Sequence, residues 1–254
     1  MPFHKTARFR PSNSNARIVT PPGLSSSRSV GATPVNSANL GLTSQRARRR
    51  MVERLREQGI TNEKVLEAML AVPRHLFVDE GLASHAYDDA ALPIGFGQTI
   101  SQPYVVARMV SAICEPDVPG KILEIGGGCG YQAAVLAQLC SRVTVVERVR
   151  GLVEQAREHL QALGLMSRVR LHYGDGMLGH PPQAPYDGIV VAAAGLTIPD
   201  ALPAQLSVGG RLIAPEGDTI QQLIMVTRTG TDAWHRTKHE FVRFVPLRPG
   251  VQAK

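Results

Sequence analysis

Hydrophobic residues recur along the chain with two different spacings, which separate a helical part from an alternating part. Between Thr43 and Leu70 they recur every three to five positions, which predicts two short helices separated at Gly59. From Lys121 onward short apolar runs alternate with amphipathic stretches, so we expect strands alternating with helices. The expected fold class is α/β, with a doubly wound, mostly parallel sheet and an N-terminal helical cap.

The same pattern places the individual elements of the alternating part. The predicted strands cover residues 122–125, 143–146, 169–173, 188–192, 211–214, 223–227 and 241–245. The predicted helices cover residues 131–139 and 151–163, and a further helix opens at Pro199. Residues 73–103 are predicted to form a long ordered loop, because prolines and glycines surround polar side chains. Such loops are uncommon unless they serve a function, so this one is a candidate site.

Composition places the chain among globular proteins and excludes wholesale disorder. Hydrophobic residues make up 43% of the 254 positions and charged residues 19%, enough apolar surface for one large domain. No run approaches the roughly 20 apolar residues of a membrane-spanning helix, and the N-terminus lacks a secretory signal, so we expect a cytoplasmic location. The cysteines stand far apart in sequence, so we expect reduced thiols and no structural zinc. They are Cys114, Cys129 and Cys140.

The net charge of +7 is concentrated at the N-terminus. Residues 1–50 hold nine Lys or Arg and no Asp or Glu, which leaves 28 − 9 = 19 basic against 21 acidic residues elsewhere. We predict a disordered basic tail over residues 1–42 and a folded domain over residues 43–250, with cap and loop to residue 120 and the sheet from residue 121. A solvated extension without a specific nucleic-acid partner is favoured over attachment to RNA, acidic proteins or membrane.

A glycine-rich turn between a predicted strand and a predicted helix carries the main chemical signal. Gly126, Gly128 and Gly130 follow Glu124 in a G-x-G-x-G spacing. A dinucleotide loop has G-x-G-x-x-G, whereas Tyr131 follows here, which disfavours an NAD-dependent dehydrogenase. An acid two positions before the first glycine suits a cofactor that presents an ammonium group, such as S-adenosylmethionine.

Two further acidic positions follow later strands of the predicted sheet. Glu147 ends the next strand, where doubly wound sheets place the residue that binds ribose hydroxyls. Asp175 and Gly176 follow the strand after that, where Asp175 can meet an adenine amino group. Taken separately, Glu147 can be a solvated strand end and Asp175 a turn residue. Together and in order, they predict a nucleoside site at one edge of the sheet.

Over about residues 48–247 the chain resembles protein-L-isoaspartate O-methyltransferases. The most specific match is the segment ALPIGFGQTISQP at residues 91–103, which fits the family's loop before the first sheet strand almost residue for residue. Other matching blocks lie at residues 72–78, 86–88, 130–134, 146–148, 174–176, 184–187, 209–212 and 244–247. The resemblance implies a class I, Rossmann-like S-adenosylmethionine-dependent methyltransferase.

The resemblance also implies a reaction and a set of site residues. The reaction is methyl transfer from S-adenosyl-L-methionine to the α-carboxylate of L-isoaspartyl residues in damaged proteins, which begins their repair. Ser101 is the implied active-site serine, whose hydroxyl orients one oxygen of the acceptor carboxylate. The implied donor-binding residues are Thr99, Ile100, Glu124, Gly126, Gly128, Gly130, Glu147, Arg148, Asp175 and Gly176. We expect a monomer whose partners are isoaspartyl proteins and peptides.

Several positions depart from the family pattern and keep alternatives open. Gly127 and Cys129 replace the family's usual Thr and Ser, His180 replaces an aromatic residue, and Ala192 replaces a Thr. A weakened donor loop suits a non-catalytic carboxylate-binding adaptor, and the basic tail suits a methyltransferase that acts on RNA or a small acid.

The remaining candidate residues are expected to shape or pack the structure and not to take part in the reaction. His75, His85 and His180 receive no role, because the acceptor carboxylate is already ionised at neutral pH. Asp88 is expected to shape the acceptor loop, and residues 241–245 to line the peptide groove. Phe77 and Tyr87 are expected in the core.

Overall fold

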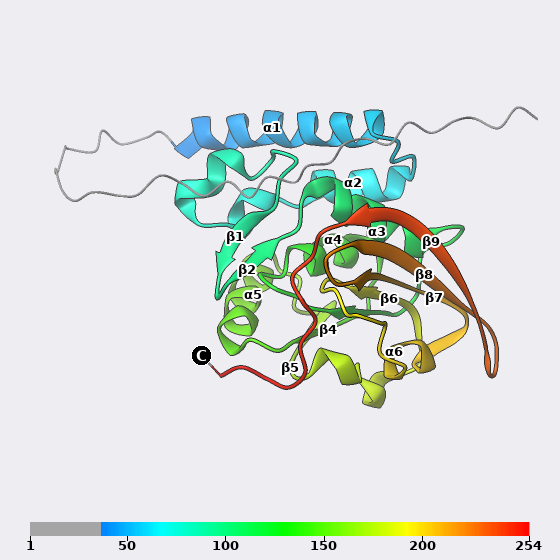
Figure 1. The fold of residues 1–254 in the computed structure, drawn as a ribbon. Coiled ribbons are helices and arrows are strands. Elements are labelled where there is room, and N and C mark those ends of the chain that lie inside the picture. Colours follow the sequence, from blue (N-terminus) through cyan, green and yellow to red (C-terminus); the bar gives the residue numbers. More distant parts are fainter. Residues whose placement is uncertain (1–36, 254) are drawn as a thin grey trace, which may run out of the picture.

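The structure, a computed structural model, describes residues 37–253, with side chains from Ser44 onward. Within these residues seven strands form one twisted sheet in the order β5-β4-β3-β6-β7-β8-β9 (Figure 1). The strands are β3 (Ile122–Ile125), β4 (Val143–Glu147), β5 (Val169–Tyr173), β6 (Tyr186–Val191), β7 (Leu206–Gly217), β8 (Gln221–Gly230) and β9 (Ala233–Val242). Strands β3 to β7 run parallel to one another, whereas β8 pairs antiparallel with both β7 and β9. The α/β prediction is confirmed.

Helices cover both faces of the sheet because its buried side chains alternate in direction. Ile122 packs into a cluster with α3 (Pro103–Cys114), α4 (Tyr131–Leu139) and α5 (Arg150–Ala162). Its neighbour Leu123 packs on the opposite face with the short helix α6 (Ala201–Ala204). Glu124 therefore shares the face of Ile122, toward α4.

The cap consists of α1 (Ser37–Glu57) and α2 (Glu63–Ala71), which lie over α3 and α4 (Figure 1). Gly59 separates them with a φ of +96°, a conformation that favours glycine. The Asn62 side chain then accepts a hydrogen bond from the Val65 N–H and caps α2. The prediction of two helices separated at Gly59 is confirmed.

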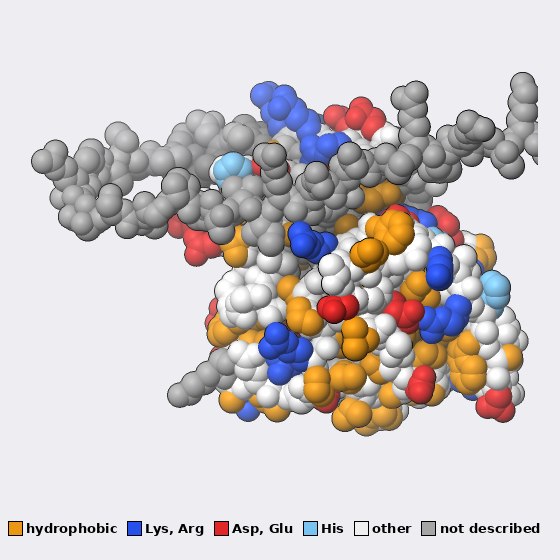
Figure 2. Space-filling view, in the orientation of Figure 1, with side chains coloured by type: hydrophobic (Ala, Val, Ile, Leu, Met, Phe, Trp, Pro, Cys, Tyr) orange, Lys and Arg blue, Asp and Glu red, His pale blue; other side chains and the backbone are white. Residues whose placement is uncertain are grey.

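The predicted basic tail can be compared with the structure only in part. Residues 1–36 lie outside the described residues, and α1 begins at Ser37, before the predicted boundary at residue 43. Figure 2 shows Lys and Arg side chains gathered over α1. No helix among residues 37–253 is both long and apolar enough to cross a membrane.

Three segments differ from the sequence prediction. The predicted loop at residues 73–103 contains the 3-10 turns η1 (Arg74–Phe77) and η2 (Glu80–His85) and a hairpin of β1 (Leu92–Gly95) and β2 (Gln98–Ile100). Helix α3 follows, which the pattern did not identify. The strand predicted at residues 241–245 is wrong in extent: β9 begins at Ala233 and ends at Val242. Most of β9 is exposed, so it lacks the apolar alternation that would have identified it.

Two 3-10 turns complete the fold on the loops after β5. These are η3 (Gly176–Leu178) and η4 (Pro181–Gln183). The chain then leaves β9 and returns along the carboxyl ends of the parallel strands (Figure 1). There Ala194 donates its N–H to the Val245 carbonyl, and Leu247 donates to the Ala194 carbonyl. The last described residues lie beside α5, where Val149 and Gln252 form a parallel bridge.

Candidate active site

The glycine turn between β3 and α4 lies where the parallel strands end, the edge at which open α/β sheets bind ligands. Gly128 and Gly130 adopt φ values of +52° and +88°. A Cβ on Gly130 would lie 3.1 Å from the Ala156 Cβ, so glycine lets α4 begin directly against α5. The turn thus brings backbone N–H groups at the start of α4 to the edge of the sheet.

A small pocket opens between this turn and the β1–β2 hairpin. Its volume is about 40 Å³, room for about three water molecules. On the hairpin side, the Ile94 Cδ1 lies so near Gly128 that an added Cβ would meet it at 3.2 Å. The lining residues are Ile94, Thr99, Ile100, Ser101, Val106, Glu124, Gly126, Gly127, Gly128, Cys129, Tyr131, Gln132 and Ala192.

Glu124 is the buried acid of this pocket, with no exposed surface. Its Oε1 accepts a hydrogen bond from Gln132 Nε2 at 3.2 Å, whereas Oε2 is buried without a hydrogen-bond partner among the described residues. Burial raises the pKa of Glu124 to about 8, and the Glu147 charge adds to this, whereas the Gln132 hydrogen bond lowers it. A buried acceptor with one unused oxygen fits a ligand that brings a cation or an N–H donor.

The end of the hairpin places Ser101 in the lining of the same pocket. Thr99 pairs with Pro93 in the hairpin register, and Ser101 follows β2 directly. Within residues 37–253 the Ser101 hydroxyl makes no hydrogen bond, so it can donate to a ligand. The pocket thus brings together five of the predicted donor-binding residues and the predicted catalytic serine. They are Thr99, Ile100, Ser101, Glu124, Gly126 and Gly128.

Glu147 lies beside the pocket without lining it. Only 6% of its surface is exposed, and its Oε2 accepts a hydrogen bond from the Gly128 N–H at 3.0 Å. Its Oε1 accepts from the Val149 N–H at 2.8 Å. Glu147 therefore fixes the glycine turn to the end of β4, and each oxygen keeps a second lone pair for another donor.

The remaining predicted donor-binding residues lie farther along the sheet edge. Gly130 begins α4, and a Cβ on Gly176 would fall 2.5 Å from the Ile125 Cγ2, so Gly176 permits close packing on β3. Arg148 donates from Nε to the Gly250 carbonyl at 3.1 Å, and Asp175 accepts from the Gly250 N–H. The structure therefore does not bring these four residues into the pocket; residues 248–252 lie against two of them.

Sequence reasoning missed Gln132, Tyr131, Val106 and Ile94 as pocket residues. The sequence did mark Gln132 as unusual, because it is a polar residue near the start of an otherwise apolar helix. In the structure it is buried, with only 7% of its surface exposed. Ile94 lay within the segment matched to the family, although no property of the sequence marks which hairpin side chain faces the turn.

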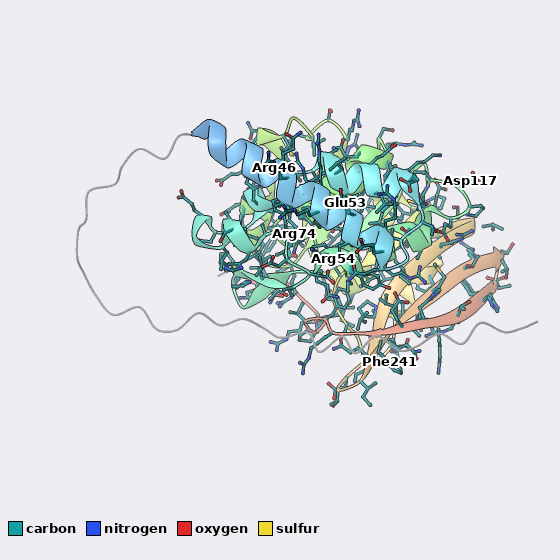
Figure 3. The ribbon with its side chains drawn as sticks, turned by 90° about the horizontal axis from the view of Figure 1, so that it is seen from above. Arg46, Glu53, Arg54, Arg74, Asp117 and Phe241 are labelled. Carbon is teal, nitrogen blue, oxygen red and sulfur yellow. The ribbon has the colours of Figure 1, made fainter. Side chains whose placement is uncertain are left out.

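Behind the turn lies Arg74, a fully buried arginine that Figure 3 places beneath α1. Its Nε donates to the Ala86 carbonyl at 2.7 Å, and its guanidinium carbon lies 4.7 Å from the Tyr131 ring centroid. Burial lowers the pKa of Arg74 and raises the pKa of Cys129 to about 11. The Cys129 thiol is therefore protonated at neutral pH and is a poor nucleophile.

None of the three candidate histidines lines the pocket. His75 Nδ1 lies 2.7 Å from the Tyr87 hydroxyl, and His85 pairs with Asp88 at 3.0 Å on the surface. His180 stacks on His172 with ring centroids 3.9 Å apart. The predicted core positions Phe77 and Tyr87 are buried, at 0% and 5% exposure.

A sequence model described as protein-L-isoaspartate(D-aspartate) O-methyltransferase matches residues 46–252. A protein-L-isoaspartate O-methyltransferase of Bordetella parapertussis is 62% identical over 243 residues, covering 96% of this chain and 93% of that protein. The corresponding protein of Aromatoleum aromaticum is 55% identical over 84% of this chain and 96% of its own length. This chain belongs to the protein-L-isoaspartate O-methyltransferase family.

Solved structures agree with the family assignment. A protein-L-isoaspartate O-methyltransferase superposes with a TM-score of 0.71 at 27% identity, over 80% of this chain and 67% of that chain. A Plasmodium falciparum protein solved in complex with S-adenosyl-L-homocysteine superposes with a TM-score of 0.69 at 24% identity, over 79% and 98% of the two chains, and thus shares the fold.

The match to the Bordetella protein extends beyond the family domain. Because only 4% of 254 residues, about ten, lie outside that alignment, it includes much of the basic segment before residue 43. The family model itself begins at residue 46.

Proposed function

We propose that this member of the family transfers a methyl group from S-adenosyl-L-methionine to the α-carboxylate of L-isoaspartyl residues. The observation that carries the proposal is the pocket, which both Ser101 and the glycine turn line. The family match over residues 46–252 supports the same assignment.

The residues present fit the donor. A sulfonium donor also carries an ammonium group, and the unpartnered Glu124 Oε2 is a buried acceptor for it. At Gly128 an added Cβ would meet the Ile94 Cδ1 at 3.2 Å, so glycine keeps the space between hairpin and turn open at this point. When bound, the donor supplies an electrophilic methyl group on a positively charged sulfur.

The chain's own residues have little proton chemistry to perform. A carboxylate with a solution pKa of about 3 to 4 is already the nucleophile at neutral pH. The Ser101 hydroxyl donates a hydrogen bond to one oxygen of the acceptor carboxylate. The other carboxylate oxygen remains free to attack the methyl group. The apolar wall of Ile94, Ile100 and Val106 keeps water from the reacting charges.

The acceptor peptide is proposed to lie along residues 241–245, next to this pocket. Ala192 lines the pocket, and two residues later Ala194 bonds to the Val245 carbonyl. Phe241 is 65% exposed at the end of β9, on the side of the molecule away from Arg46 (Figure 3). Phe241→Ala is expected to raise the peptide KM several-fold and to leave donor binding unchanged; an unchanged KM would contradict this placement.

We further propose a cytoplasmic monomer without a specific nucleic-acid or membrane partner. Cys114, Cys129 and Cys140 are all unpaired and buried, which suits a reducing compartment. Light scattering coupled to size exclusion tests the oligomeric state, and a mass near twice 27.4 kDa would contradict the proposed monomer.

The deciding experiment is incubation of the pure protein with methyl-labelled S-adenosylmethionine and paired peptides that differ only in aspartyl or isoaspartyl linkage. Label is expected on the isoaspartyl peptide alone. Label on RNA that disappears when residues 1–42 are removed would favour the RNA alternative. Donor binding without transfer to either peptide would favour a binding protein.

A further inference from the structure

Gln132 makes the side-chain hydrogen bond that holds the buried acid of the pocket. It is the second residue of α4, and only 7% of its surface is exposed. Its Nε2 donates to Glu124 Oε1 at 3.2 Å, and both residues line the same pocket. The other amide atom, Oε1, makes no hydrogen bond within residues 37–253, so it remains an available acceptor.

We propose that Gln132 is the positioning residue for the donor's ammonium group: it fixes Glu124 so that Oε2 faces the pocket, and it adds its own Oε1 as a second acceptor. This inference rests on the proposed donor of the preceding section. It assigns the recognition of an ammonium group to a pair of side chains from two different elements, β3 and α4.

The geometry explains why an amide, and not a second charge, occupies this position. An ammonium group has three N–H donors and needs several acceptors around it. A carboxylate at position 132 would lie beside the buried Glu124 and repel it, whereas an amide can donate to Glu124 and still present an oxygen. A purely apolar side chain would leave both Glu124 oxygens buried without a partner.

Charge around Glu124 determines how the pair responds to pH. The groups that act on Glu124 are the Glu147 carboxylate at the end of β4 and the Gln132 amide on α4, and the Cys129 thiol interacts with Glu124 from the turn. Glu147 raises the pKa of Glu124 and Gln132 lowers it, so loss of the amide shifts ionisation of Glu124 to higher pH. Binding of a cation then requires Glu124 to release its proton first.

The test measures binding of S-adenosyl-L-homocysteine by titration calorimetry, which needs no acceptor and no turnover. Repeating each titration in buffers of different ionisation enthalpy gives the number of protons released. The wild-type protein is expected to release close to one proton at about pH 7 and almost none about two pH units higher, since the pKa of Glu124 is about 8.

Gln132→Met keeps the length and helix preference of the side chain and removes both polar atoms. It is expected to weaken binding about ten- to a hundredfold near pH 7, because hydrogen bonds to a charged group are lost. Proton release is expected to continue to higher pH than in the wild type. The matched control is Gln138→Met on the exposed side of the same helix, where the amide bonds only to the Ala134 carbonyl.

A double-mutant cycle with Glu124→Gln separates positioning from a general packing effect. The part of the loss that acts through Glu124 disappears in the Glu124→Gln background, and only the part due to the Gln132 Oε1 acceptor remains, so Gln132→Met costs less affinity there than in the wild type. Equal losses in both backgrounds, or a loss with an unchanged profile of proton release, would overturn the proposal. If Gln132→Met does not fold, Gln132→Asn takes its place, because its side chain retains the amide but is too short to reach Glu124. The same losses of affinity and the same change in proton release are then expected.

Failure of this inference is distinguishable from failure of the proposed function. A protein that binds S-adenosyl-L-homocysteine with the expected proton release but does not methylate isoaspartyl peptides would retain the Gln132 assignment. If the wild-type protein methylates isoaspartyl peptides but Gln132→Met binds S-adenosyl-L-homocysteine as tightly as the wild type, only the role of Gln132 is contradicted.

Discussion

Asp175 accepts a hydrogen bond from the Gly250 N–H, with 2.6 Å between Oδ2 and the nitrogen. Its other oxygen accepts from the Met177 N–H at 2.9 Å and caps η3. Gly250 belongs to a C-terminal strap, residues 248–252, which also bonds to the backbone of Arg148 and Arg150. The carboxylate that the sequence assigns to adenine thus also fastens the strap across that end of the sheet edge.

Replacing Asp175 should release this strap. Asp175→Ala removes two accepted hydrogen bonds and is expected to lower the free energy of unfolding by about 1–3 kcal/mol. The freed terminus should be trimmed faster by a carboxypeptidase, as followed by intact mass. Asp218→Ala, in an exposed turn, is the control and should trim like the wild type. Equal trimming of all three proteins would contradict the fastening role.

The departure at Gly127 is matched by a neighbouring side chain. A Cβ built on Gly127 would overlap the Val145 Cγ1, so the space that the family's Thr would need is filled by β4. Gly127→Ala is therefore expected to cost about 1–3 kcal/mol of stability through overpacking. Urea unfolding measures this difference directly.

A second substitution at Val145 tests whether overpacking against this side chain causes the loss of stability. Val145→Ala alone leaves a small cavity and is destabilising, but combined with Gly127→Ala it should recover stability, so that the two effects are strongly non-additive. Gly81→Ala, where an added Cβ only meets Asp79 at 3.5 Å, is the control. Additive losses would show that the two sites do not share this space.

Much of the sheet could be predicted because its strands are short and apolar. The observed β3, β5 and α4 have the predicted bounds, since each carries a run of one periodicity that ends at a turn. β9 escaped this reasoning: it lies at the sheet edge with most residues exposed, and hydrogen bonds to β8 determine its position.

The residues of the candidate site show the same contrast between features that are local in sequence and features that depend on folding. Glu124 and the glycine turn were predictable because both are local in sequence and carry their own chemistry. The partner of Glu124 was not, because Gln132 belongs to a different element and only folding brings it within 3.2 Å. Likewise, the strap on Asp175 depends on a contact across 75 positions of the chain.

The role of Ser101 gives a direct kinetic prediction. Ser101→Ala removes one donor to the acceptor carboxylate and is expected to lower kcat/KM for an isoaspartyl peptide about ten- to a hundredfold. Affinity for S-adenosyl-L-homocysteine should remain, because Ser101 faces the acceptor. An unchanged kcat/KM would exclude this role.

Ser111→Ala provides the matched control for Ser101. Ser111 lies within α3, and its hydroxyl is buried without a hydrogen-bond partner in the described part of the chain. Removing that hydroxyl should leave activity unchanged and keep or slightly raise stability, since a buried unsatisfied group is lost.

The stacked pair of His172 and His180 predicts a loss of stability in mild acid. Burial lowers the pKa of both rings, and the charges of Arg170 and of His180 add to the effect on His172. Below about pH 6.5 the unfolded chain therefore binds protons that the folded chain resists, so stability falls as the pH drops through this range. His180→Phe keeps a ring at 180 but removes one titrating group, and its melting temperature should fall less between neutral and mildly acidic pH. His235→Phe, exposed on β9, should behave like the wild type; the same acid sensitivity in all three proteins would place the titrating groups elsewhere.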